Sequence, residues 1–186
     1  MRIYTRADCE PIDEHADFYQ KIIVCGGSNL AQFPPGQLFL CVDRECKDTK
    51  QTFIDCISLA NGERYLCGRE DIIGILKTEL LPDESKLHLS QICRHEDRDF
   101  ADQSPLYSGY CFLEDGKYAA GVWLYSEQEV MDYIKLQKMY QHRVLICDRD
   151  DFAVMEIVEG KLVFPDEQTL QEFCQERRAD GGMAMA

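Results

Sequence analysis

The chain has 186 residues, of which 34 are acidic and 20 are basic, and its formal charge is −14 at neutral pH. A surface this negative is repelled by nucleic-acid phosphates and anionic lipid, so the composition argues against direct nucleic-acid binding and favours basic protein surfaces as partners. No stretch approaches the roughly 20 consecutive apolar residues of a membrane-spanning helix, and Met1–Glu14 is charged where a secretory signal would be apolar. We therefore expect a cytoplasmic protein that does not bind membranes.

An apolar content of 45% at this length predicts one folded domain over residues 1–178. The polar, highly charged segment 95–105 is a candidate sub-boundary within that domain. Residues 179–186, which include Gly181-Gly182, predict a flexible tail.

Apolar runs separated by turn residues predict the first strands of the chain, at Lys21–Cys25 and Gln37–Asp43. Asn61-Gly62 then predicts a hairpin turn, because both residues tolerate positive φ. We expect a short strand at Arg64–Cys67 after that turn and a helix at Arg69–Lys77. The apolar side of this helix would consist of Ile72, Ile73, Ile75 and Leu76.

The middle of the chain predicts a further strand and a second hairpin with its helix. Leu87–Cys93 has the composition of a strand. Asp115-Gly116 predicts the hairpin turn, with a strand after it at Lys117–Tyr125. A helix is expected from Ser126 to about Gln141, because Ser126 and Glu129 form a capping box.

A third hairpin is predicted to join Phe152–Val158 and Lys161–Phe164 through Glu159-Gly160, and Pro165-Asp166 predicts the start of another helix. The apolar stripe of that helix would consist of Leu170, Phe173 and Cys174. Their offsets from the turn glycine equal those of the first expected helix from Gly62, which suggests a repeated unit. The sequence therefore predicts an α+β fold with a mostly antiparallel sheet built from units of a β-hairpin followed by a helix.

Ten cysteines are many for this length, and the expected cytoplasmic compartment is reducing. Most lie in apolar runs, so we interpret them as buried core residues; examples are Cys25, Cys41, Cys56, Cys111 and Cys147. Cys25 also precedes Gly26-Gly27-Ser28 at a strand end, where a thiol could face backbone amides and act as a nucleophile. This alternative is a thiol-dependent hydrolase or transferase, which would also need a histidine such as His15, His95 or His142.

A zinc site is a further alternative, for which four residues could supply ligands: Cys41, Cys46, Cys93 and His95. Their spacing is not that of paired zinc knuckles, and the chain contains no C-x-x-C motif. The sequence also has no P-loop and no G-x-G-x-x-G motif. We therefore expect no metal and no cofactor.

The acidic excess is unevenly distributed along the chain. Residues 21–60 and 118–147 are neutral, whereas residues 148–186 carry ten acidic and four basic side chains. Three acidic tracts stand out: Asp8, Glu10, Asp13, Glu14 and Asp17; Glu96, Asp97, Asp99 and Asp102; and Asp148, Asp150 and Asp151. Three interpretations of these tracts are open. They could form a solvated surface or act as paired catalytic carboxylates. Alternatively, carboxylates spaced like phosphates could occupy the nucleic-acid channel of a basic enzyme. We take the second and third tracts as candidate partner-binding residues.

Three segments carry a resemblance to other proteins: GGSNLAQFPPGQLFLCVDRECKD, LPDESKLHLSQI and DRDDFAVMEIVEGKLVFP. Over about half of the chain they resemble uncharacterised small acidic proteins of Firmicutes mobile elements. The resemblance implies an anti-CRISPR-like inhibitor of a Cas9-type nuclease and carries over no catalytic residue. We therefore expect a non-enzymatic inhibitor that binds a basic protein surface as a nucleic-acid mimic. An accessory subunit of a mobile-element complex is an alternative, and the oligomeric state is open.

Overall fold

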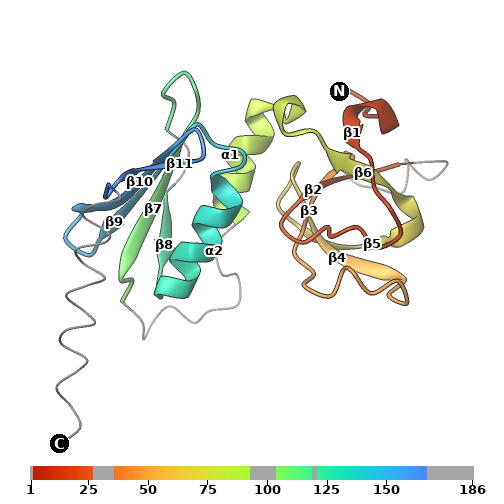
Figure 1. The fold of residues 1–186 in the computed structure, drawn as a ribbon, viewed down its shortest axis with the longest axis horizontal. Helices are drawn as coiled ribbons and strands as arrows, with labels where there is room; N and C mark the ends of the chain where they lie inside the picture. The colour runs from red at the N-terminus through yellow and green to blue at the C-terminus, as the bar shows by residue number, and fades with distance from the viewer. Residues whose placement is uncertain (1, 27–35, 93–103, 119–120, 167–186) are drawn as a thin grey trace, which may run out of the picture. The chain divides into compact units, whose positions relative to one another are not determined.

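The computed structural model describes residues 2–26, 36–92, 104–118 and 121–166 (Figure 1). The chain forms two compact units, residues 1–97 and residues 98–186, which we call the first and second units. Within the described residues, each unit contains one antiparallel sheet and one α-helix. The predicted α+β class with antiparallel sheets is therefore confirmed.

The first unit is a six-stranded sheet with the order β1-β6-β2-β3-β4-β5. Its strands are β1 (Cys9–Glu10), β2 (Ile22–Cys25), β3 (Leu38–Cys41), β4 (Phe53–Ser58), β5 (Arg64–Gly68) and β6 (Ile72–Leu76). Its helical elements are the 3-10 turns η1 (Arg6–Asp8), η3 (Arg69–Asp71) and η4 (Thr78–Leu80), and the helix α1 (Asp83–Ile92). The strands predicted around β2, β3 and β5 are confirmed.

The helix predicted at Arg69–Lys77 is wrong, because this segment forms η3 and then β6. The side chains of β6 alternate between buried and half-buried, which is the two-residue period of a strand. Gly74 fixes this strand beside β1, since a Cβ atom there would lie 2.5 Å from the Cβ atom of Cys9. The apolar residues of this segment fit both the helical and the strand period. Pairing with β1 and β2 favours the strand.

The strand predicted at Leu87–Cys93 is also wrong, because Asp83–Ile92 forms α1. Pro82 precedes this helix and Asp83 and Glu84 occupy its first turn, where negative charge stabilises the exposed amides. His88 attaches the helix to the first unit, because its Nδ1 atom lies 2.8 Å from the carbonyl oxygen of Leu59.

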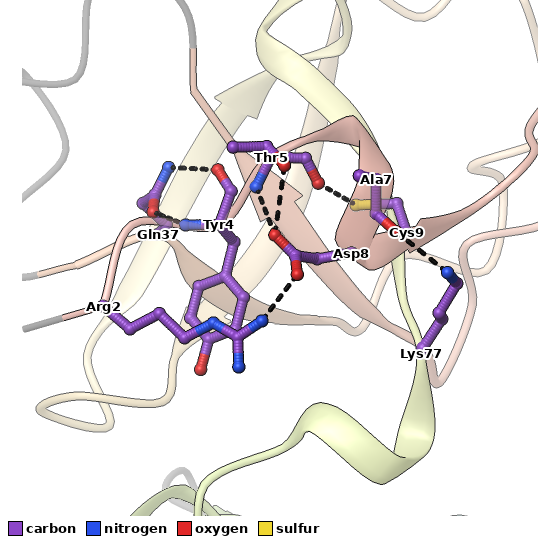
Figure 2. Close-up of polar contacts among 8 residues, drawn as sticks. All are labelled: Arg2, Tyr4, Thr5, Ala7, Asp8, Cys9, Gln37 and Lys77. Atoms are coloured by element: carbon purple, nitrogen blue, oxygen red, sulfur yellow. Dashed lines mark hydrogen bonds and ion pairs between the residues drawn. The ribbon is translucent and has the colours of Figure 1, made fainter.

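Polar side chains hold the N-terminal segment against this sheet (Figure 2). The amide of Tyr4 donates to Oε1 of Gln37 at 2.7 Å, and Nε2 of Gln37 donates to the Cys25 carbonyl at 3.2 Å. Asp8 accepts from the amide of Thr5 at 2.8 Å and from Nη2 of Arg2 at 2.6 Å. The first acidic tract therefore contains a carboxylate that organises the fold.

The second unit is a five-stranded sheet with the order β11-β10-β9-β7-β8. Its elements are β7 (Tyr107–Phe112), β8 (Val122–Leu124), α2 (Glu127–Gln137), β9 (Arg143–Asp148), β10 (Ala153–Val158) and β11 (Lys161–Phe164). The predicted hairpin at Glu159-Gly160 is confirmed, with φ of 50° and 76° at its two turn residues. The helix predicted after Pro165-Asp166 lies mainly outside the described residues.

The Ser126 half of the predicted capping box of α2 is confirmed, since Oγ of Ser126 accepts from the amide of Glu129 at 3.2 Å. The Glu129 carboxylate in turn accepts from the amide of Tyr125 at 2.8 Å. The helix ends at Gln137, four residues before the expected end near Gln141. Helix α2 follows β8, but the first predicted hairpin-and-helix unit is replaced by strand β6, so the described elements do not form the predicted repeat.

Helix α2 packs on one face of the second sheet, over β7, β8 and β9. Tyr133 of this helix lies over Gly109, where a Cβ atom would come within 2.6 Å of its ring. Its hydroxyl lies 2.9 Å from the Sγ atom of Cys111. Gly109 and Cys111 therefore point toward the helix, and their neighbours on β7 point to the opposite face.

Candidate protein-binding surface

Four aromatic side chains gather on the side of the second sheet opposite α2, and we call this surface the aromatic face. It consists of Tyr110, Phe112, Tyr118 and Trp123. Tyr110 and Phe112 alternate with the helix-facing residues of β7, and Trp123 of β8 pairs with Ser108 across the sheet. Tyr118 bridges to Phe112 from the segment between β7 and β8. Trp123 is 62% exposed and Tyr118 is 55% exposed, so the face presents aromatic surface to solvent.

Three rings of the aromatic face pack together, with Tyr118 in contact with Tyr110 and with Phe112. The centroid of Tyr118 lies 6.0 Å from that of Tyr110 and 5.8 Å from that of Phe112, with tilted ring planes. Gly121 leaves room for them, because a Cβ atom there would lie 2.9 Å from the Tyr118 hydroxyl and 3.0 Å from the Tyr110 ring. Tyr110, Phe112 and Tyr118 therefore form a packed array, and Trp123 lies on the same face of the sheet.

A cation already lies on this array. The guanidinium of Arg143, from β9, is 4.9 Å from the centroid of Phe112. Its Nε atom donates to Oε1 of Glu156 on β10 at 2.5 Å. A charged group is thus stacked on an aromatic ring and paired with a carboxylate, an arrangement that favours guanidinium over ammonium.

The third acidic tract forms the turn between β9 and β10, and we call residues 148–152 the acidic turn. Oδ1 of Asp148 accepts from the amides of Asp150 at 3.0 Å and Phe152 at 2.9 Å. Asp151 has a φ of 65°, which aspartate and asparagine tolerate better than most residues. Asp150 and Asp151 are exposed, so their carboxylates are available to a partner.

One hydrogen bond joins the acidic turn to the aromatic face. The Tyr110 hydroxyl donates to Oδ1 of Asp151 at 3.2 Å. A hydrogen bond with Ser108 lowers the pKa of Tyr110, but burial and the negative charge of Asp151 outweigh it and raise that pKa above its usual value. The acidic turn and the aromatic face are therefore one continuous surface of the second unit.

The carboxylates of this turn form no ion pair with the described residues. In the part of the chain that the structure describes, the ion pairs involve other acidic residues, and none includes Asp148, Asp150 or Asp151. Asp8 and Asp17 of the first tract differ, since they pair with Arg2 at 2.6 Å and Lys47 at 2.8 Å. The acidic turn thus presents carboxylates that are exposed at Asp150 and Asp151.

The structure brings the three predicted residues of the third tract together in one turn. The second tract, Glu96, Asp97, Asp99 and Asp102, lies outside the described residues, so its role stays a prediction. The aromatic face was missed at the sequence level. Its signal was the spacing of Tyr110 and Phe112 two residues apart with Trp123 on the next strand, which places them on one face of a sheet.

The alternative nucleophile Cys25 lies in the core of the first unit with an exposed fraction of 0%. A hydrogen bond with the Cys67 thiol and burial raise the pKa of Cys25, whereas a reactive cysteine needs an accessible thiolate. Cys41, Cys46 and Cys56 are buried in the same core cluster. The described cysteines therefore pack as small apolar residues.

The first unit has a cavity of about 440 Å³ with polar side chains in its lining. Arg2, Gln37 and His88 line it, but each already bonds within the chain, to Asp8, Tyr4 and the Leu59 carbonyl respectively. We assign it no chemistry.

Within residues 2–26, 36–92, 104–118 and 121–166, no group of three or more side chains is placed to hold a metal ion. Two members of the candidate zinc set, Cys93 and His95, lie outside these ranges. Among the described helices, none combines the length and apolar character needed to cross a membrane.

Comparison with protein-family models, curated proteins and solved structures found no match to this chain.

Proposed function

We propose that this protein binds a basic surface of a nucleic-acid-handling enzyme of the Cas9-type nuclease class and blocks its nucleic-acid site. The observation that carries the proposal is the hydrogen bond between Tyr110 and Asp151, because it makes the acidic turn and the aromatic face one surface. The formal charge of −14 supports the same conclusion. The protein then acts as an inhibitor without chemistry of its own.

The two parts of this surface correspond to the two parts of a single-stranded nucleic acid. Nucleic-acid channels neutralise phosphates with lysine and arginine and stack bases on aromatic or guanidinium groups. Carboxylates of the acidic turn take the place of phosphates, and the rings of Tyr118 and Trp123 take the place of bases. A surface with both features competes with a nucleic acid more effectively than one with negative charge alone.

The test is inhibition of DNA cleavage by a Cas9-type nuclease, measured with the full chain at low and high salt. We expect inhibition that weakens as salt increases, because exposed charges are screened. A variant with Asp148→Asn, Asp150→Asn and Asp151→Asn should inhibit at least tenfold less, since the surface loses about three charge contacts of about 0.5 kcal/mol each. The asparagines keep the turn, because their side-chain oxygens still accept hydrogen bonds and asparagine tolerates positive φ.

The matched control changes the same number of charges elsewhere. Glu10→Gln, Glu45→Gln and Glu79→Gln alter exposed residues of the first unit and change the formal charge from −14 to −11, as the triple asparagine variant does. We expect this control to inhibit almost as well as the natural chain. Equal loss in both triple variants, or inhibition that is independent of salt, would rule out a specific role for the acidic turn.

A further inference from the structure

The partner chemistry of the aromatic face can be inferred from the cation that it already holds. Arg143 is stacked on Phe112 at 4.9 Å and paired with Glu156 at 2.5 Å. Within the chain, then, this sheet face binds a guanidinium with one ring and one carboxylate.

In the described part of the chain, aromatic rings and a carboxylate occur together a second time on the aromatic face with no cation placed on them. The rings of Tyr110 and Tyr118 are 6.0 Å apart and tilted by 42°, and the carboxylate of Asp151 lies 3.2 Å from the Tyr110 hydroxyl. Tyr118 contacts both Tyr110 and Phe112, so the ring that holds Arg143 is adjacent to the second set of rings. In the described part of the chain, the cation–π contacts involve other rings, namely those of Tyr4, Tyr19, Phe18 and Phe112.

We propose that Tyr110, Tyr118 and Asp151 form a docking site for an arginine side chain of the partner protein. Arginine fits better than lysine because its planar guanidinium stacks on rings, is more weakly hydrated than an ammonium, and can donate two parallel hydrogen bonds to one carboxylate. A second copy of this chain is disfavoured as the occupant, because two surfaces of formal charge −14 repel each other. The site deepens the proposed function, on which it rests, by naming the residue type that the acidic surface selects.

The chain contains its own reporter for this site. Trp123 is the single tryptophan, it lies on the aromatic face, and it is 62% exposed. Its fluorescence therefore reports binding at this face.

The experiment compares hexa-arginine with hexa-lysine, two peptides of equal charge, in titrations of the full chain followed by Trp123 fluorescence. We expect hexa-arginine to bind about threefold to fivefold more tightly, the size of an exposed cation–π contact. Tyr118→Leu should reduce this preference, because one of the two rings of the site is lost. Phe53→Leu is the matched control, because Phe53 is 56% exposed on the first unit, and it should leave the preference unchanged.

Asp151→Asn is a second variant for the case in which Tyr118→Leu fails to fold by circular dichroism. It should weaken both peptides and reduce the arginine preference, since the carboxylate is lost and the turn is kept. Equal affinity of the natural chain for both peptides, or a preference of unchanged size in both variants, overturns the arginine site. The peptide result is independent of any nuclease, so arginine preference without inhibition rejects the proposed function alone, and inhibition without arginine preference rejects the site alone.

Discussion

The Tyr110 hydroxyl donates to the Asp151 carboxylate at 3.2 Å, across the boundary between the aromatic face and the acidic turn. Tyr110 belongs to β7, whereas Asp151 lies in the turn between β9 and β10, so the contact joins segments that are 41 residues apart in the sequence. This hydrogen bond can be tested in the isolated chain, without a partner.

Asp151→Asn should lower the pKa of Tyr110. The negative charge of Asp151 is one of the causes that raise this pKa, and asparagine removes the charge while keeping a side-chain oxygen. Tyrosine ring carbon resonances, followed by NMR from neutral to alkaline pH, give the titration directly. Asp150→Asn is the control and should change the Tyr110 pKa less. An unchanged titration in the Asp151 variant contradicts the contact.

Asp148 should matter for the stability of the turn, whereas Asp150 should not. Replacing Asp148 by Ala removes the acceptor of two backbone amides, which we expect to lower the free energy of unfolding by about 1 kcal/mol. Asp148→Asn should cost less, because it retains the acceptor oxygen, and Asp150→Ala should change stability by less than about 0.5 kcal/mol. Urea unfolding of the four chains measures the differences. Equal stability of Asp148→Ala and Asp150→Ala contradicts the structural role of Asp148.

The thiols of the described cysteines should react only when the protein unfolds. All eight are buried, and burial together with a hydrogen bond to Cys67 disfavours the thiolate of Cys25. The protein is labelled with a thiol reagent under native conditions and analysed by peptide mass spectrometry. Cys25 should remain unmodified at the time when the exposed thiols of a control peptide are fully modified. Fast modification of Cys25 in the folded chain supports the thiol-dependent enzyme instead.

Asp8 should contribute to stability at neutral pH and lose this contribution in acid. The hydrogen bond from the Thr5 amide and the nearby Arg2 guanidinium lower the pKa of Asp8 (Figure 2). A carboxyl whose pKa is lower in the folded state stabilises the fold above its unfolded pKa of about 3.9, and the effect disappears as pH falls through the folded value. Asp8→Asn should lower the melting temperature at neutral pH and show a smaller further loss on acidification. Glu10→Gln serves as the control, and identical acid profiles for the two variants contradict this role.

Local signals predicted those elements whose boundaries depend on nearby residues. Glu159-Gly160 determined the hairpin of β10 and β11, and the Ser126 cap determined the start of α2. Strand β6 could not be predicted in this way, because its apolar residues fit both periods and distant strands decide between them. Helix α1 had a start signal in Pro82 and Asp83, but the apolar composition of Leu87–Cys93 suggested a strand.

The candidate site also has one part that local sequence signals predict and one part that depends on distant contacts. The clustered acids of the turn were visible in the sequence as Asp148, Asp150 and Asp151. The aromatic face depends on which side of the sheet α2 covers, and the packing of Tyr133 over Gly109 decides this. That contact joins a helix to a strand distant in the sequence, so no local pattern revealed that Tyr110 and Phe112 face away from the helix.

The most direct test of a single binding surface is fluorine NMR of the chain labelled with fluorotryptophan, since Trp123 is the one tryptophan and lies on the aromatic face. On addition of a Cas9-type nuclease at low salt, we predict that the Trp123 resonance shifts or broadens. We also predict that it stays unchanged in the variant with Asp148→Asn, Asp150→Asn and Asp151→Asn. Formation of a complex by gel filtration with no change in the Trp123 resonance would contradict the account, because the nuclease would then bind elsewhere on the chain.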